Sequence, residues 1–279
     1  MLSWVRVTRG DAPLIVSIPH SGDQLPPEME RQVVSPWLAR KDTDWHVEKL
    51  YDFAPELGAT VIRTSLSRTV IDVNRDPSGK PLYPGQQTTD LCPTTTFDGE
   101  PLYRSGQEPK RQEISRRRTA YFEPYHRALA EEIARLRGQH QKIVLYDAHS
   151  IRSTVPQLFK GQLPDFNIGT NDGQSCAPAL AGAVENICDP TGYLRATDGR
   201  FKGGWITRHY GNPAEGVHAI QMELSCRCYL REPDEEHWSA RPQYERDNWP
   251  PPYDADRAAP IRQALHGILQ ACISFANKP

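Results

Sequence analysis

The chain has 279 residues, of which 38% are hydrophobic and 24% are charged, so it can bury a sizeable core and is not disordered by composition. The formal net charge is −2 and the sequence has no basic block, which argues against a nucleic-acid partner. The sequence also lacks a run of about eighteen apolar residues, which argues against a membrane span. The first residues lack a basic segment followed by a long apolar stretch, so we expect a cytoplasmic protein without a secretion signal.

Neither an internal repeat nor a linker divides the chain, so the sequence predicts one domain over 1–279. Residues 233–257 are rich in proline and tryptophan and are expected to form a loop or an accessory arm. The six cysteines are expected to be reduced thiols, several of them buried, because no signal directs the chain to an oxidising compartment. Cys226 and Cys228 have no further Cys or His at ligand spacing nearby, so they do not indicate a zinc site.

Strand and helix signals alternate in the first part of the chain. The apolar run 14–18 predicts a buried strand, and apolar residues at helical spacing in 43–57 predict a helix. Residues 59–64 and 70–73 predict two further short strands. From 76 to about 106, Pro, Gly and Thr are frequent, which predicts a long irregular loop of the kind that often carries function.

The alternation continues to the end of the chain. Apolar residues recur at three- and four-residue steps in 113–139, the strongest predicted helix, and 143–146 predicts the central strand. A helix is then predicted at 177–187, a strand at 219–224 and a closing helix at 258–276. This order favours a single-domain α/β fold with a mixed, mostly parallel sheet flanked by helices.

Two histidines follow apolar strands directly. His20 comes after the run 14–18 and His149 after the central strand, and parallel strands deliver residues at their carboxyl ends to a shared crevice. Two imidazoles with a carboxylate form a common divalent-metal site that leaves a position open for water. Asp42 and Asp44 both lie between the histidines and either can supply the carboxylate, although Asp is also a common N-cap at the start of a helix. His46 is a rival ligand.

Three further segments carry candidate side chains. Arg75 follows the predicted strand at 70–73, and its planar fork suits a substrate carboxylate, although a surface salt bridge would use the same residue. Glu223 lies inside an otherwise apolar strand, where a carboxylate is costly unless it is paired, functional or on a solvent-facing edge. The glycine-containing segment after Phe201 can bring Arg208 or Tyr210 to a ligand.

Taken in order, these motifs resemble those of the N-formylglutamate amidohydrolase family. The resemblance runs from near residue 13 to near residue 230. It rests on several short motifs in the right order rather than on any one of them: Pro19–Gly22, Asp42–His46, Ser67–Arg75, Tyr146–Ile151, Asn167–Thr170, Phe201–Gly204 and Gly216–Leu224. The family is distantly similar to zinc carboxypeptidases and aspartoacylase, which implies their phosphorylase/hydrolase-like α/β fold.

The resemblance implies one water-activating zinc ion, or another transition metal with the same ligands. Those distant relatives have a His and a Glu three residues apart as the first two ligands, whereas this chain has Asp23 three residues after His20. The resemblance to the amidohydrolase family instead implies His20, Asp44 and His149 as metal ligands, with Asp42 as the alternative acid. It also implies that Glu223 acts as the general base.

The remaining implied roles concern a small-molecule substrate. Asn74 and Arg75 resemble the pair with which carboxypeptidases hold a terminal carboxylate, Arg68 would polarise the scissile carbonyl, and Arg208 or Tyr210 would assist binding. The implied reaction converts N-formyl-L-glutamate to formate and L-glutamate, the last step of one route of histidine degradation. The alternatives are a related zinc acyl-amino-acid hydrolase or carboxypeptidase, and a non-catalytic binder of small acids on the same scaffold.

Overall fold

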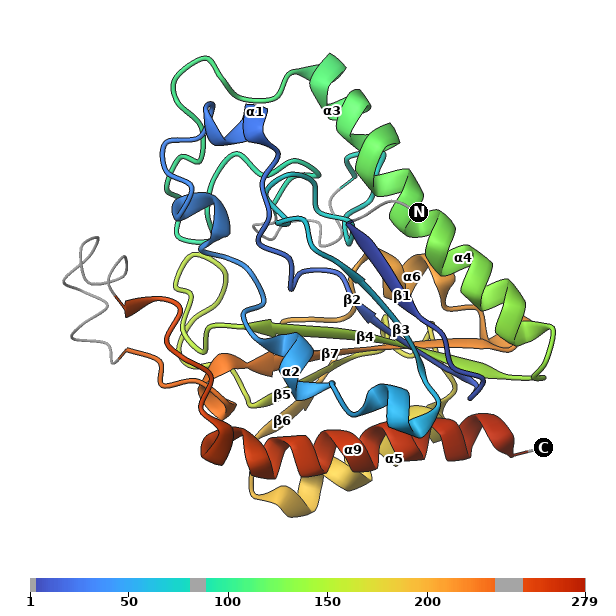
Figure 1. The fold of residues 1–279 in the computed structure, drawn as a ribbon. Coiled ribbons are helices and arrows are strands. Elements are labelled where there is room, and N and C mark those ends of the chain that lie inside the picture. Colours follow the sequence, from blue (N-terminus) through green and yellow to red (C-terminus); the bar gives the residue numbers. More distant parts are fainter. Residues whose placement is uncertain (1–3, 81–88, 234–247, 279) are drawn as a thin grey trace.

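Seven strands form one mixed sheet in the computed structural model, which describes residues 4–80, 89–233 and 248–278 (Figure 1). In chain order they are β1 (Val5–Thr8), β2 (Leu14–Ile18), β3 (Thr60–Thr64), β4 (Ile143–Ile151), β5 (Phe166–Gly169), β6 (Arg195–Thr197) and β7 (Val217–Ser225). Their order across the sheet is β1-β3-β2-β4-β7-β5-β6. The four central strands are parallel to one another, whereas β1 and β5 are antiparallel to β3 and β7. The predicted mostly parallel α/β sheet is therefore confirmed.

Helices cover both faces of this sheet. The longer helical segments are α3 (Arg111–Arg117), a π-helical turn (Arg118–Phe122), α4 (Glu123–Arg137), α5 (Pro178–Cys188) and α9 (Ala255–Asn277). The shorter helices are α1 (Pro27–Glu30), α2 (Val47–Leu50) and α6 (Trp205–Tyr210). Figure 1 shows α5 and α9 against one face and α4 and α6 against the other. No helix among the described residues is long and apolar enough to cross a membrane.

The chain direction across the sheet reverses beside β2. The connection after β2 leads to β3 on one side, and the chain then crosses back to place β4 on the other side. Such a switch point opens a crevice beyond the carboxyl ends of the strands, which is where α/β proteins bind ligands. His20 follows β2 and His149 lies near the end of β4, so the two histidines flank this crevice.

β4 and β7 carry apolar residues into the core and polar ones into the crevice. All nine residues of each strand are buried, and successive side chains point to opposite faces. On the face toward α4, Ile143 and Leu145 of β4 are followed by Asp147 and His149. Glu223 of β7 pairs with His149 in the parallel register, so its side chain lies on the same face. One face of the sheet therefore changes from core to polar site within one strand length.

Most predicted elements are confirmed, and the six cysteines are buried free thiols as expected. The predicted helix at 43–57 is largely wrong, because only Val47–Leu50 is α-helical and Ala54–Leu57 is a 3-10 turn. Asp44 does not cap a helix there. Its side chain accepts a hydrogen bond from the backbone N of Ser150 at 3.1 Å, which draws this segment toward the end of β4.

The predicted strand at 70–73 is wrong. The segment is buried, but its backbone bonds do not form a strand ladder: the N of Val70 donates to the O of Ser67, the N of Asp72 to the O of Leu91, and the N of Asn74 to Oδ1 of Asp72. A side chain that satisfies nearby backbone N–H groups competes with a strand ladder. The apolar residues of this turn therefore pack into the core without joining the sheet.

The predicted arm at 233–257 lies partly outside the described residues, which stop at 233 and resume at 248. In its described end, Trp249 is buried and its indole N donates to the backbone O of Lys41 at 3.0 Å. The backbone O of Trp249 accepts a hydrogen bond from the indole of Trp37. This end of the arm therefore packs on the segment that leads to Asp44.

Candidate active site

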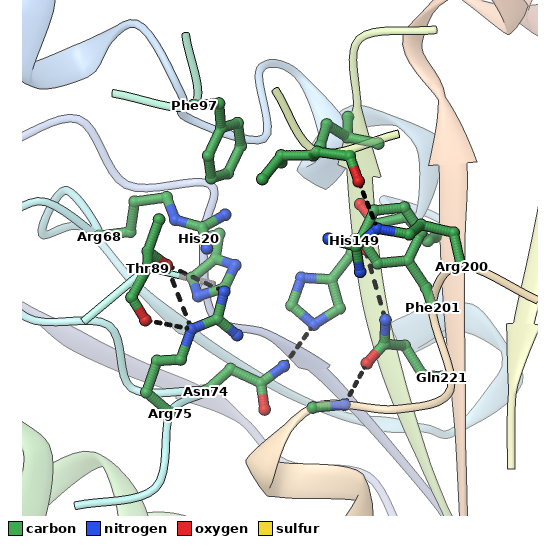
Figure 2. A pocket seen from close by; sticks show the side chains of 14 residues that line it. His20, Arg68, Asn74, Arg75, Thr89, Phe97, His149, Arg200, Phe201 and Gln221 are labelled. Atoms are coloured by element: carbon green, nitrogen blue, oxygen red, sulfur yellow. Dashed lines mark hydrogen bonds between the residues drawn. The ribbon is translucent and has the colours of Figure 1, made fainter. Parts of the chain in front are cut away.

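His20, Asp44 and His149 form a buried cluster at the crevice. Each offers one ligand atom, and these atoms all lie within 4.8 Å of one another. Nδ1 of His149 lies 3.1 Å from Oδ2 of Asp44, and Nδ1 of His20 lies 3.9 Å from the same oxygen. Figure 2 shows both imidazoles at the pocket. The three side chains could hold a metal ion, because two imidazoles and one carboxylate are an ordinary ligand set for it.

A carboxylate holds the outer nitrogen of each imidazole. Nε2 of His20 donates to Asp72 at 2.7 Å, and Nε2 of His149 lies 3.0 Å from Asp147. Metal-binding histidines commonly have such a carboxylate behind them, because it fixes the ring and its tautomer. Nδ1 of His20 is buried and has no hydrogen-bond partner among the described residues. A buried nitrogen of this kind fits a bound cation.

The third member of the cluster is Asp44, not Asp42. Burial alone would raise the pKa of Asp44, but the hydrogen bond from His149 and the charges of His20, His149 and Arg68 outweigh it and lower the pKa. Asp42 lies apart, where its Oδ2 accepts a hydrogen bond from the backbone N of Phe97 at 2.7 Å. Burial raises the pKa of Asp42 to about 6. Asp44 is thus the carboxylate that faces both imidazoles in its charged form.

Asp72 connects the cluster to two arginines. Its Oδ1 accepts hydrogen bonds from His20 and from the backbone N of Asn74, and its Oδ2 accepts one from Arg68 at 2.7 Å. Arg75 is 3.7 Å from Oδ2. Burial would raise the pKa of Asp72, but the charges of His20, Arg68 and Arg75 hold the pKa well below its usual value. This carboxylate therefore positions a candidate metal ligand and two cationic side chains at once.

Asp72→Asn is expected to weaken metal binding by about 10- to 100-fold, and Asp147→Asn by a similar factor, because each change removes the carboxylate behind one histidine. Only Asp72→Asn also leaves the buried Arg68 without its short ion pair, so it should lower the melting temperature of the metal-free protein further. Competition titration with a metal chelator and thermal unfolding measure the two effects. Equal melting temperatures in the two variants would contradict the connecting role of Asp72.

Glu223 lies beside His149 on the neighbouring strand and lines the same pocket. It is buried, and its Oε2 accepts a hydrogen bond from Gln221 at 3.4 Å. Burial raises the pKa of Glu223 to about 8, with Asp44 adding to the rise and His149 opposing it. A carboxyl group with a pKa near neutrality is suited to accept and return a proton.

The pocket opens above these groups and encloses about 560 Å³ of empty space, including its mouth. Its other walls are made of Arg68, Arg75, Thr89, Phe97, Leu158, Arg200 and Phe201. Most of its charged wall residues are arginines, which predicts an anionic ligand.

Comparison with known proteins identifies the family. The family model described as N-formylglutamate amidohydrolase matches residues 12–230. This chain belongs to that family. A protein of Pseudomonas aeruginosa named N-formylglutamate deformylase is 45% identical over 271 residues, which cover 97% of this chain and 96% of that protein. Its counterpart from Pseudomonas putida is 44% identical over 268 residues, 96% and 94% of the two chains. The family assignment made from the sequence motifs is confirmed.

A solved structure shows the same fold. The crystal structure of N-formylglutamate amidohydrolase from Ralstonia eutropha matches this chain with a TM-score of 0.77 at 23% sequence identity and covers 99% of both chains. At this identity the match concerns the fold alone. The α/β architecture is therefore that of a solved amidohydrolase, and the chemistry has to be argued from the residues of this chain.

In this member of the amidohydrolase family, Arg68 and Arg75, for which the sequence motifs implied roles toward the substrate, both line the pocket. The guanidinium of Arg68 lies 4.8 Å from the centre of the Phe97 ring. Nε of Arg75 donates to the backbone O and to Oγ1 of Thr89, both at 3.2 Å. These contacts fix both guanidinium groups at the pocket wall.

Asn74 also lines the pocket, but its amide is engaged with the protein. Its Nδ2 donates to Asp147 at 2.9 Å and lies 2.9 Å from Nε2 of His149, while its Oδ1 accepts a hydrogen bond from the backbone N of Ile206. A Cβ at Gly204 would lie 2.4 Å from Nδ2 of Asn74, so this contact requires glycine. Asn74 thus joins the end of β4 to the start of α6.

The structure does not bring Arg208 and Tyr210 to the pocket. Both lie on α6, whose first residues approach the site while its last turn faces α4. Nε of Arg208 donates to the backbone O of Gly203, and the hydroxyl of Tyr210 bonds to His126 of α4. Arg200, to which no sequence motif gave a role, lines the pocket from the irregular segment before α6. No periodicity marks that residue.

Proposed function

We propose that this chain hydrolyses N-formyl-L-glutamate to formate and L-glutamate, using a divalent metal ion, zinc in the first instance, at His20, Asp44 and His149. The observation that carries the proposal is the position of Glu223 beside this ligand set, inside a pocket with arginines on its walls. Relatives that are 44% and 45% identical over nearly their whole length carry the name N-formylglutamate deformylase, which supports the substrate.

In the proposed reaction, Glu223 transfers the proton and Arg68 stabilises the developing negative charge. A bound metal ion supplies Lewis-acid chemistry, since it acidifies water and polarises a carbonyl oxygen. The carboxylate of Glu223 takes a proton from the attacking water as the water oxygen bonds to the formyl carbon. When the carbon–nitrogen bond breaks, Glu223 passes that proton to the departing amine nitrogen. Arg68, held by Asp72 and stacked on Phe97, stabilises the negative charge that develops on the formyl oxygen.

Arg75 is the proposed partner of the α-carboxylate. Its guanidinium is half-buried at the pocket wall, and a planar fork binds a carboxylate through two parallel N–H bonds. Asn74 supports Arg75 because it belongs to the same turn, and its hydrogen bond from the backbone N of Ile206 holds α6 beside that turn. The proposal thus places the scissile amide between the metal ligands and Arg75.

Formate release from N-formyl-L-glutamate, compared with hydrolysis of N-acetyl-L-glutamate and of a peptide-linked glutamate, tests this function. We expect the formyl substrate to have the highest kcat/KM, with the acetyl compound about 10- to 200-fold lower, because one extra methyl group has to fit beside the metal ligands. A higher kcat/KM on the peptide would indicate a carboxypeptidase. Tight binding of N-formyl-L-glutamate without any hydrolysis by the metal-loaded protein would indicate a non-catalytic binder.

The proposal includes action in the cytoplasm. The six cysteines of the chain are free and buried in the structure, and free thiols are typical of proteins in a reducing compartment. Fractionation of cells that make the protein, with the formate-release assay applied to each fraction, tests this part. Activity confined to a secreted or periplasmic fraction would contradict it.

A further inference from the structure

The walls of the pocket carry arginines on opposite sides of His149. Figure 2 shows Arg75 on one side of His149 and Arg200 on the other. Arg75 comes from the turn after Asp72, whereas Arg200 comes from the segment between β6 and α6, so the two guanidinium groups reach the pocket from separate parts of the fold. N-formylglutamate carries two carboxylates, and the proposed function assigns only the first of them to a side chain.

Local contacts hold Arg200 in place at the pocket. Its Nε donates to the backbone O of Leu158 at 2.7 Å, and its guanidinium carbon lies 5.1 Å from the centre of the Phe201 ring. The backbone O of Leu158 and the ring of Phe201 thereby hold one donor and one face of the guanidinium at the pocket wall. A guanidinium fixed in this way binds a carboxylate without first losing much side-chain freedom.

The surroundings of Arg200 match an amino-acid side chain that ends in a carboxylate. Leu158 and Phe201 form an apolar wall next to it, which suits the two methylene groups of a glutamate side chain. Of the described residues that line the pocket, Glu223 is the sole carboxylate, and it lies beside His149 at the reacting end. The Arg200 side of the pocket is therefore the end suited to a second negative charge.

We propose that Arg200 is a specificity-determining residue that binds the side-chain carboxylate of the substrate, while Arg75 binds the α-carboxylate. This inference rests on the proposed function and extends it to substrate selection. It assigns the second carboxylate to a different residue from Arg208, which the structure places outside the pocket.

The test compares N-formyl-L-glutamate with N-formyl-L-glutamine, which has nearly the same shape but a neutral side chain. We expect Arg200→Gln to reduce the ratio of the two kcat/KM values by about 100-fold, mainly through a higher KM for the glutamate substrate. Hydrolysis of the glutamine substrate should change only a few-fold. Arg200→Lys keeps the charge but loses the fork, so about a tenfold loss of the ratio is expected.

Arg195→Gln is the matched control, because this arginine lies on the preceding strand and pairs with Glu185 and Asp189 instead of lining the pocket. It should retain the wild-type ratio. If Arg200→Gln does not fold, Arg200→Lys carries the test. The inference fails if Arg200→Gln lowers kcat/KM equally for both substrates. It also fails if Arg208→Gln, and not Arg200→Gln, removes the preference for the glutamate substrate. Absence of formate release by the wild-type enzyme from either substrate would instead overturn the proposed function.

Discussion

Glu223→Gln is expected to lower the rate of formate release by about 10²- to 10⁴-fold while leaving metal content and substrate binding close to those of the wild type. The substitution preserves the shape of the side chain and its hydrogen bond with Gln221 but removes the group that accepts the proton. Of the described residues that line the pocket, Glu223 is the sole carboxylate, so no neighbour there replaces it as base. Steady-state kinetics, metal analysis and calorimetric titration with N-formyl-L-glutamate measure the three quantities.

Although Glu223→Gln is expected to lose activity, it is expected to stabilise the metal-free protein at pH 8. In the unfolded chain Glu223 loses its proton near pH 4.5, whereas in the folded metal-free protein its pKa is raised to about 8 by burial. The folded state therefore binds more protons between these values, and its stability falls as the pH rises from about 4.5 to about 8. Gln cannot ionise, so metal-free Glu223→Gln should melt at a higher temperature than metal-free wild type at pH 8, and the gap should close toward pH 4.5.

Glu132→Gln is the control for this experiment. Glu132 is another buried glutamate, but it lies on α4 and pairs with Arg9 and Arg135, away from the pocket. Its replacement should reduce stability and leave turnover unchanged. A near-normal rate for Glu223→Gln, or a melting temperature below that of the wild type at pH 8, would contradict the role assigned to this carboxyl group.

Sequence reasoning located the parts of the site that lie on long buried strands. A polar residue within an apolar run is visible without coordinates, because burial of its charge is costly unless it is used. That signal made His149 and Glu223 candidates, and the parallel register of β4 and β7 places them side by side. His20 was found in the same way, as the polar residue that follows a buried strand.

The rest of the site depends on contacts between distant segments. The irregular geometry around Asp44 arises because its side chain bonds to Ser150, more than one hundred positions away, and helical periodicity cannot reveal such a bond. Arg200 enters the pocket from a segment with no regular pattern, and β1, β5 and β6 are only three or four residues long. Such short elements contain too few residues to show a reliable hydrophobic periodicity, so their secondary structure depends on pairing with distant segments of the chain.

Asp44→Asn is expected to reduce metal affinity by at least about 100-fold and to remove formate release at limiting metal, because it replaces a charged ligand with a weak neutral one. Asp44 faces both imidazoles of the cluster, and its carboxylate is kept charged by His149, His20 and Arg68. The Asn side chain can still accept the hydrogen bond from the backbone N of Ser150, so the local fold is preserved. Metal competition titration and formate release over a range of metal concentrations measure the two effects.

Asp42→Asn tests which carboxylate binds the metal, because the sequence left Asp42 and Asp44 as alternatives. Asp42 has its pKa raised to about 6 and accepts a hydrogen bond from the backbone N of Phe97, which an Asn carbonyl can also accept. Arg152, which lies 3.7 Å from Oδ1 of Asp42, keeps its short ion pair with Asp98. We therefore expect Asp42→Asn to bind metal like the wild type and to retain most of its activity. The opposite pattern, with metal lost in Asp42→Asn and kept in Asp44→Asn, would show that the cluster of His20, Asp44 and His149 is not the metal site.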